Sequence, residues 1–184
     1  SHLRLSNSSE TINGKQYMTS FEYDPANRIT KVTYPSGLCL SKVFSNTGYE
    51  KEIYDGNNLL WKANETMANG SITEYQLGNG LITKMSYNPK TSLIDNICTF
   101  SDRVCIQNVE YSYDDWGNML SRNQYGATKM VEEFEYDKYD RLVSAKLNGI
   151  RSLSMNYDFQ GNIVEKKEKD VRVLYSTMYD KERT

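Results

Sequence analysis

The chain has 184 residues, with 22 basic and 24 acidic side chains and a mean hydropathy of −0.70. This balance argues against nucleic-acid binding, which leaves a basic footprint, and no run of eighteen apolar residues is present for insertion into a membrane. Tyrosine is the main aromatic residue, with 15 copies against 5 of phenylalanine, and it suits a sheet whose faces are only partly covered.

The first clear structural unit occupies residues 21–38. Apolar and polar residues alternate up to Tyr23, which is typical of a half-buried strand. Asp24 follows, and its carboxylate is expected to accept backbone N–H groups in an Asx-type turn. Asn27, four residues after the tyrosine, belongs to the residue types that tolerate a left-handed backbone. The segment therefore predicts a strand, a tight turn and a second strand.

Residues 44–100 contain weaker copies of the same unit. Phe44 lies 21 residues after Tyr23 and keeps a glycine four positions later, but it is not followed by aspartate. Tyr87 starts another copy, in which Thr91 occupies the fourth position after the tyrosine. We expect hairpins here as well, built from less regular turns.

Cys98 and Cys105 flank a predicted hairpin. A turn at Ser101-Asp102 would place them opposite each other, where a disulfide is geometrically possible. Two free thiols are the preferred alternative, because the third cysteine, Cys39, has no evident partner. The single histidine, His2, and the absence of a CxxC pattern leave a zinc site without support.

The unit is clearest at residues 109–165. Tyr113, Tyr136, Tyr157 and Tyr179 are 23, 21 and 22 residues apart, and a fixed period of this size marks a repeat architecture. A second turn signal such as Asn148-Gly149 falls half a period away, so each repeat supplies two strands. The residues that define the repeat are Tyr23, Asp24, Tyr113, Asp114, Gly117, Tyr136, Asp137, Tyr157, Asp158 and Gly161.

These units predict an all-β chain of tandem β-hairpin repeats, 21 to 23 residues long, that form a long, curved antiparallel sheet. About eight units of two strands would give on the order of sixteen strands. We interpret residues 1–184 as a single repeat array and as a fragment of a larger protein. A further repeat is expected to begin at Tyr179.

The Tyr-Asp-x-x-Gly-Asn-x-Leu-like units at 21–38 and 109–165 resemble the YD repeats of the RHS family. The resemblance implies a sheet that winds as a spiral ribbon into a hollow shell, which in bacterial toxin complexes and polymorphic toxins encloses a toxic C-terminal domain. Other members are cell-wall-associated proteins, some linked to carbohydrate binding, and the related animal teneurins serve cell adhesion. The resemblance thus implies an extracellular or cell-surface protein. Its expected partners are other repeats of the same chain and either a carbohydrate or a toxin cargo.

Catalysis is the least favoured function. Asp114, Asp137 and Asp158 offer carboxylates of the type that glycoside hydrolases use in pairs. However, an aspartate that recurs in every unit is expected if it forms the turn, whereas a single active site would not need it in every unit. Calcium binding by these acidic turns is likewise disfavoured, because backbone groups already occupy the carboxylates. We therefore expect neither an enzyme nor a cofactor.

Exposed aromatic residues are the candidate ligand-facing groups: Trp61, Trp116, Tyr139 and Phe159. The last three occupy near-equivalent turn positions, so their rings can stack on sugars or pack against neighbouring turns. Ring-on-ring packing between hairpins is the preferred interpretation. The sequence as a whole predicts a structural scaffold, with a carbohydrate-binding module as the alternative.

Overall fold

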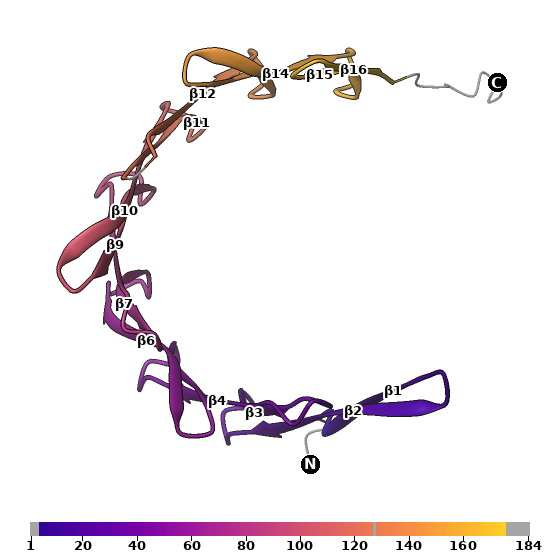
Figure 1. Ribbon diagram of the computed structural model, residues 1–184, viewed down its shortest axis with the longest axis vertical. Coiled ribbons are helices and arrows are strands. Elements are labelled where there is room, and N and C mark those ends of the chain that lie inside the picture. The colour runs from indigo at the N-terminus through magenta and orange to yellow at the C-terminus, as the bar shows by residue number, and fades with distance from the viewer. Residues whose placement is uncertain (1–3, 127, 176–184) are drawn as a thin grey trace. The chain divides into compact units, whose positions relative to one another are not determined.

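The computed structural model describes residues 4–126 and 128–175 (Figure 1). Within these residues all regular structure is β-strand, and consecutive strands are neighbours in a single sixteen-stranded sheet. The strands are β1 (Asn7–Ile12), β2 (Lys15–Tyr23), β3 (Ile29–Thr33), β4 (Cys39–Phe44), β5 (Glu50–Asp55), β6 (Asn58–Thr66), β7 (Ile72–Leu77), β8 (Ile82–Tyr87), β9 (Ile94–Ser101), β10 (Val104–Tyr113), β11 (Met119–Tyr125), β12 (Met130–Tyr136), β13 (Leu142–Leu147), β14 (Ile150–Tyr157), β15 (Ile163–Glu168) and β16 (Val171–Leu174). The prediction of tandem hairpins in one antiparallel sheet is confirmed. The expected copy at Tyr179 lies outside the described residues, as does His2.

The strands group into two compact units. Unit 1 comprises Ser1–Met85 with Thr99–Val104, and unit 2 comprises Ser86–Cys98 with Cys105–Thr184. Both units contain the same element, a pair of antiparallel strands joined by a tight turn. The expectation that residues 1–184 form one array stays a prediction.

In unit 1 the two faces of the sheet differ in polarity. The register places Phe21 opposite Val32, and Val32 opposite Leu40, so these three apolar side chains share a face. The other face carries cross-strand ion pairs, such as Lys31 with Glu22 at 2.9 Å. Two further pairs, Lys62–Glu52 and Lys84–Glu74, repeat the arrangement. The period-two alternation read from the sequence thus becomes one apolar and one charged face.

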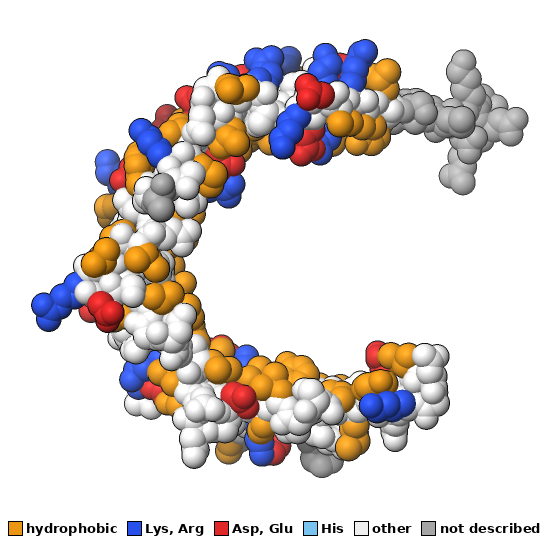
Figure 2. All heavy atoms as spheres, viewed as in Figure 1, with side chains coloured by type: hydrophobic (Ala, Val, Ile, Leu, Met, Phe, Trp, Pro, Cys, Tyr) orange, Lys and Arg blue, Asp and Glu red, His pale blue; other side chains and the backbone are white. Residues whose placement is uncertain are grey.

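Unit 2 repeats this division. Phe134, Ala145 and Leu153 share a face through the pairings of β12, β13 and β14. Lys146 and Glu135 form an ion pair at 2.6 Å on the opposite face. In the described part of the chain, the buried hydrophobic residues are Ala63, Val109 and Ala145. Hydrophobic side chains accordingly reach the surface throughout the view in Figure 2.

Two sequence predictions need correction. Cys98 and Cys105 form a disulfide, so the preferred free-thiol interpretation of this pair is wrong. Their Cα atoms are 6.4 Å apart, within the range for a disulfide, although the turn falls one residue later than expected. The copy that begins at Tyr87 is also one residue longer than expected, because the left-handed backbone is at Ser92 (φ 60°) and not at Thr91.

Candidate functional site: a ladder of capped turns

One five-residue turn recurs in both units. The N–H of its first residue donates to the carbonyl of its fifth, and the N–H of its fourth donates to the carbonyl of its first. In the described part of the chain this pattern begins at Asp24, Tyr34, Ser45, Met67, Leu77, Asp114, Asp137 and Asp158. The fourth residue always has a positive φ, from 60° at Asp140 to 94° at Gly48. That requirement explains why Gly, Asn or Asp recurs four residues after the repeat tyrosine.

A register shift precedes the turn in the better repeats. It lies between Glu135 and Tyr136 and between Asn156 and Tyr157, and the equivalent shift is found before Tyr23 and Tyr113. Such bulges redirect the side chain that follows them. The shift therefore sets the direction of the tyrosine ring.

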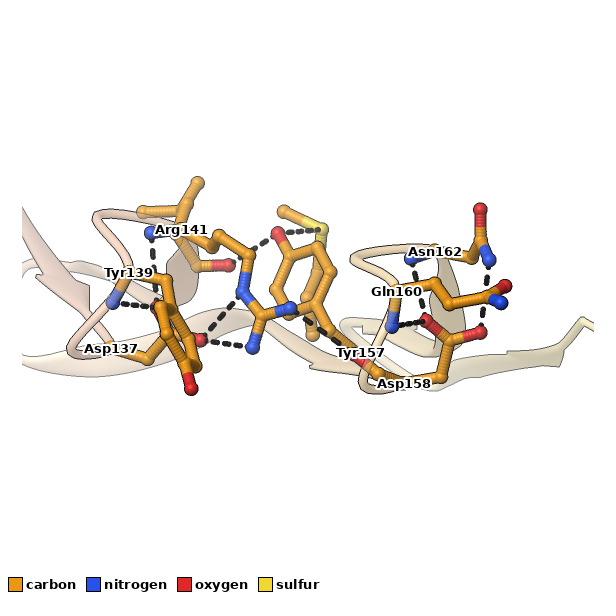
Figure 3. A network of polar contacts seen from close by, with 9 residues as sticks. Asp137, Tyr139, Arg141, Tyr157, Asp158, Gln160 and Asn162 are labelled. Atoms are coloured by element: carbon orange, nitrogen blue, oxygen red, sulfur yellow. Dashed lines mark hydrogen bonds and ion pairs between the residues drawn. The ribbon is translucent and has the colours of Figure 1, made fainter.

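The aspartate caps its own turn, as predicted. In the turn 137–141, Asp137 Oδ1 accepts hydrogen bonds from the N–H groups of Tyr139 (2.9 Å) and Arg141 (3.2 Å), and Oδ2 accepts from Arg141 Nε at 2.7 Å (Figure 3). Asp158 repeats this arrangement, with Asn162 in place of the arginine. Both carboxylates thus accept their hydrogen bonds from groups of their own turn.

These hydrogen bonds lower the pKa of the capping carboxyls. The side chain of Arg141 is the main cause at Asp137, and that of Asn118 at Asp114. At Asp24 the main cause is the backbone N–H of Arg28. Carboxyls with a lowered pKa remain charged at neutral pH, so these three cannot act as general acids there.

Two repeat tyrosines of unit 2 join their turns to the preceding hairpin. The hydroxyl of Tyr157 donates to the carbonyl of Leu142 at 2.8 Å, and that of Tyr136 donates to Met119 at 2.9 Å. In both cases the acceptor lies six residues after the tyrosine of the preceding repeat. Burial raises the pKa of Tyr136. The sequence did not predict these hydroxyl contacts between hairpins.

The fifth turn residue makes a second link between neighbouring turns. Figure 3 shows the Arg141 guanidinium between its own Asp137 and the next turn; its Cζ lies 4.6 Å from the Tyr157 ring centroid, and Nη1 donates to the Asp158 carbonyl at 3.2 Å. Arg28 lies over the Phe44 ring at 4.3 Å in the same way. Sequence reasoning missed this role, although both arginines occupy the fifth position after their tyrosine.

The four predicted ligand-facing aromatics are divided between the two units, with Trp61 in unit 1 and the other three in unit 2. Trp61 is half-buried in β6, with its ring centroid 6.3 Å from that of Tyr75. Trp116, Tyr139 and Phe159 stand at the tips of successive turns of unit 2 and are 84%, 64% and 91% exposed. The preferred ring-on-ring interpretation is therefore wrong for these three residues. Their role toward a ligand stays a prediction.

A metal site is not evident in the described ranges, where no three His, Cys, Asp or Glu residues cluster suitably. No helix suited to crossing a membrane occurs among the described residues.

Comparison with known proteins points to one family. The RHS-repeat family model matches residues 2–38. The crystal structure of TcdB2-TccC3-Cdc42 shares the fold with a TM-score of 0.72 at 18% identity, over 94% of this chain and 11% of that chain. A Tc holotoxin pore from Photorhabdus luminescens gives 0.70 at 19% identity, over 87% of this chain and 10% of that one. A search of curated protein sequences found no significant match.

The hairpin sheet and its recurring capped turn define a repeat-built all-β protein. The match of the RHS-repeat model to residues 2–38 confirms the predicted resemblance in that segment, and the Tc complexes share the fold over most of the chain's length. It spans about a tenth of the length of those neighbours.

Proposed function

We propose that this chain is a scaffold segment of a larger RHS-type protein and forms part of the wall of a shell. The observation that carries the proposal is the ladder that joins successive turns. Tyr136 and Tyr157 each bind the backbone of the preceding hairpin, and Arg141 binds both its own turn and the next. The successive repeats that begin at Tyr113, Tyr136 and Tyr157 are thereby attached to one another, as a wall of repeats requires.

The state of the carboxylates supports a structural role over catalysis. Asp114 and Asp137 accept several hydrogen bonds within their own turns and have lowered pKa values. A catalytic acid would need a raised pKa and a free approach for substrate. We therefore propose that the turn carboxylates serve the fold.

The proposal extends to partners and location. Further repeats of the same chain would pair with β1 and β16, because within residues 4–126 and 128–175 each of these terminal strands of the sheet is paired along one edge. By the family resemblance, the shell is secreted or displayed at the cell surface and holds a C-terminal toxin domain as cargo.

Electron cryomicroscopy of the full-length protein that contains this sequence tests the proposal. We expect residues 4–175 to lie within a continuous β-ribbon, with other repeats hydrogen-bonded to β1 and β16. The scaffold proposal fails if both edges remain unpaired and the segment stands apart from other repeats.

A second candidate function is carbohydrate binding. It is favoured by the exposed rings of Trp116, Tyr139 and Phe159 at successive turn tips, since exposed aromatic faces suit stacking on sugar rings. A glycan array probed with this chain tests it. Binding that disappears in Trp116→Ala is the expected result, and an array without any bound glycan would eliminate this candidate.

A further inference from the structure

The three exposed rings of unit 2 are held on a fixed frame. Each stands in a five-residue turn closed by two backbone hydrogen bonds and capped by an aspartate: Asp114 for Trp116, Asp137 for Tyr139 and Asp158 for Phe159. Contacts between turns, such as Arg141 with Asp158, further restrain them. Large rings on restrained turns lose little conformational freedom when they bind a ligand.

The sheet sets the spacing of these turns. The turns 114–118, 137–141 and 158–162 lie at the same ends of their strands, and we call this row of turns the turn edge of unit 2. Successive turns in the row are separated by two strands, which corresponds to roughly 10 Å along the sheet. Every second sugar of an extended β-(1→4)-linked glycan recurs at about this distance and presents the same ring face. The row of turns thus matches the two-sugar period of such a polymer.

The charge of the edge selects among glycans. The three turns hold five carboxylates, Asp114, Asp115, Asp137, Asp140 and Asp158, against two cations, Lys138 and Arg141. Arg141 moreover already contacts Asp137 and the rings of Tyr139 and Tyr157. A net negative edge repels uronate-containing or sulfated polymers and the headgroups of anionic lipids.

We propose that this turn edge of unit 2 binds a linear, neutral, β-(1→4)-linked glycan, with an aromatic ring under every second sugar. The proposal rests on the candidate carbohydrate function and specifies its ligand. Trp116 and Phe159, which are 84% and 91% exposed, supply the outer stacking surfaces. Tyr139 stands on the turn between them, and its ring also has Lys138 Nζ at 4.9 Å and Arg141 Cζ at 5.1 Å from its centroid.

Unit 1 provides an internal control. Its turns 24–28, 45–49 and 67–71 have the same backbone hydrogen bonds, but their second and third positions carry no aromatic residue. These positions are Pro25, Ala26, Asn46, Thr47, Ala68 and Asn69. The same turn frame without rings is therefore expected not to bind.

Calorimetric titration of the 184-residue chain with cello- and chito-oligosaccharides of increasing length tests the proposal. Affinity should rise as the ligand grows long enough to reach a second ring and then a third. Trp116→Ala and Phe159→Ala should each weaken hexasaccharide binding roughly fivefold or more. Ile150→Ala removes an apolar side chain that is 75% exposed at the start of β14 and should leave binding unchanged.

Three further probes decide between explanations. Maltohexaose has the wrong linkage and heparin the wrong charge, so neither should bind comparably. Equal binding of maltohexaose, or binding without dependence on length, would overturn this inference while leaving the general carbohydrate candidate intact. Binding to anionic vesicles through Trp116 and Phe159 would assign the edge to a membrane and overturn it as well. The scaffold proposal does not depend on any of these results, because microscopy of the full-length protein tests it separately.

Discussion

The turns of units 1 and 2 share a backbone but differ in their side chains. The three ring-bearing turns of unit 2 all begin with aspartate, whereas the turns of unit 1 on the equivalent side of their hairpins begin with Asp24, Ser45 and Met67. All six keep the same pair of backbone hydrogen bonds and a positive φ at the fourth residue. The comparison shows that backbone geometry defines this turn. The aspartate adds side-chain hydrogen bonds to a turn that also forms without them.

The missing caps of unit 1 are replaced locally. Ser45 Oγ accepts from the N–H of Tyr49 at 3.1 Å, which reproduces one of the aspartate's hydrogen bonds. In the turn that begins at Met67, Asn69 Oδ1 accepts from the N–H of Ser71 at 3.0 Å. Different residues therefore satisfy the same backbone donors, which makes the repeat hard to recognise from sequence in this region.

The largest expected difference between the units lies at the turn glycines. A Cβ on Gly70 would lie 2.3 Å from the Tyr49 ring, in addition to the strain of φ +87°. A Cβ on Gly161 would meet only Arg141 Nη1 at 3.9 Å. We expect Gly70→Ala to lower the free energy of unfolding by about 2–3 kcal/mol and Gly161→Ala by about 1 kcal/mol. Denaturant unfolding of both variants measures this, and equal losses would contradict the crowding at Gly70.

The second difference concerns cysteine. Unit 2 holds the Cys98–Cys105 disulfide, and unit 1 holds the free thiol of Cys39. Under denaturing but non-reducing conditions, alkylation followed by mass spectrometry should label one cysteine, and after reduction three. Closing this short loop is worth about 2 kcal/mol, so Cys105→Ser should destabilise the chain by that amount, whereas Cys39→Ser, the matched control, should not. Labelling of all three cysteines before reduction would show that the disulfide is absent.

A smaller effect is expected from the repeat tyrosine. Tyr157→Phe removes the hydroxyl that donates to the Leu142 carbonyl and should cost about 1 kcal/mol. Phe44 occupies the equivalent position in unit 1 and lacks a hydroxyl, so Phe44→Tyr should stabilise unit 1 by up to about 1 kcal/mol. Thermal unfolding of the two variants measures both changes. A destabilising Phe44→Tyr would show that the tyrosine link does not transfer to unit 1.

Much of this architecture could be predicted because the turn leaves a strong local signal. Asp, followed three residues later by Gly, Asn or Asp, identifies the turns at Asp24, Asp114, Asp137 and Asp158. Turns were expected at Asn69-Gly70 and Gly78-Asn79-Gly80, but those that begin at Met67 and Leu77 were not recognised as copies of the unit, since their first residue is not aspartate and their shared backbone hydrogen bonds leave no trace in sequence. The tyrosine hydroxyl and Arg141 links also escaped prediction, because they depend on the register between successive hairpins. The exposure of Trp116 and Phe159 likewise depends on the direction in which each turn projects.

Acid should distinguish the two units without any substitution. Among the described residues, the carboxyls with a lowered pKa include Asp24, Glu52 and Glu74 in unit 1, and Asp114, Glu135, Asp137, Glu165 and Glu168 in unit 2. A carboxyl whose pKa is lower folded than unfolded contributes stability above its unfolded value, 3.8 for aspartate, and this contribution is lost as the pH falls through the folded value.

Below a pH of about 4, unit 2 should therefore lose amide protection in hydrogen exchange before unit 1. Asp114→Asn retains one acceptor oxygen but cannot titrate, so its turn should be less stable at neutral pH and should depend less on pH than in the parent chain. The opposite order of unfolding, with unit 1 first, would mean that the serine and asparagine replacements in unit 1 are weaker than the aspartate caps even when the latter are protonated.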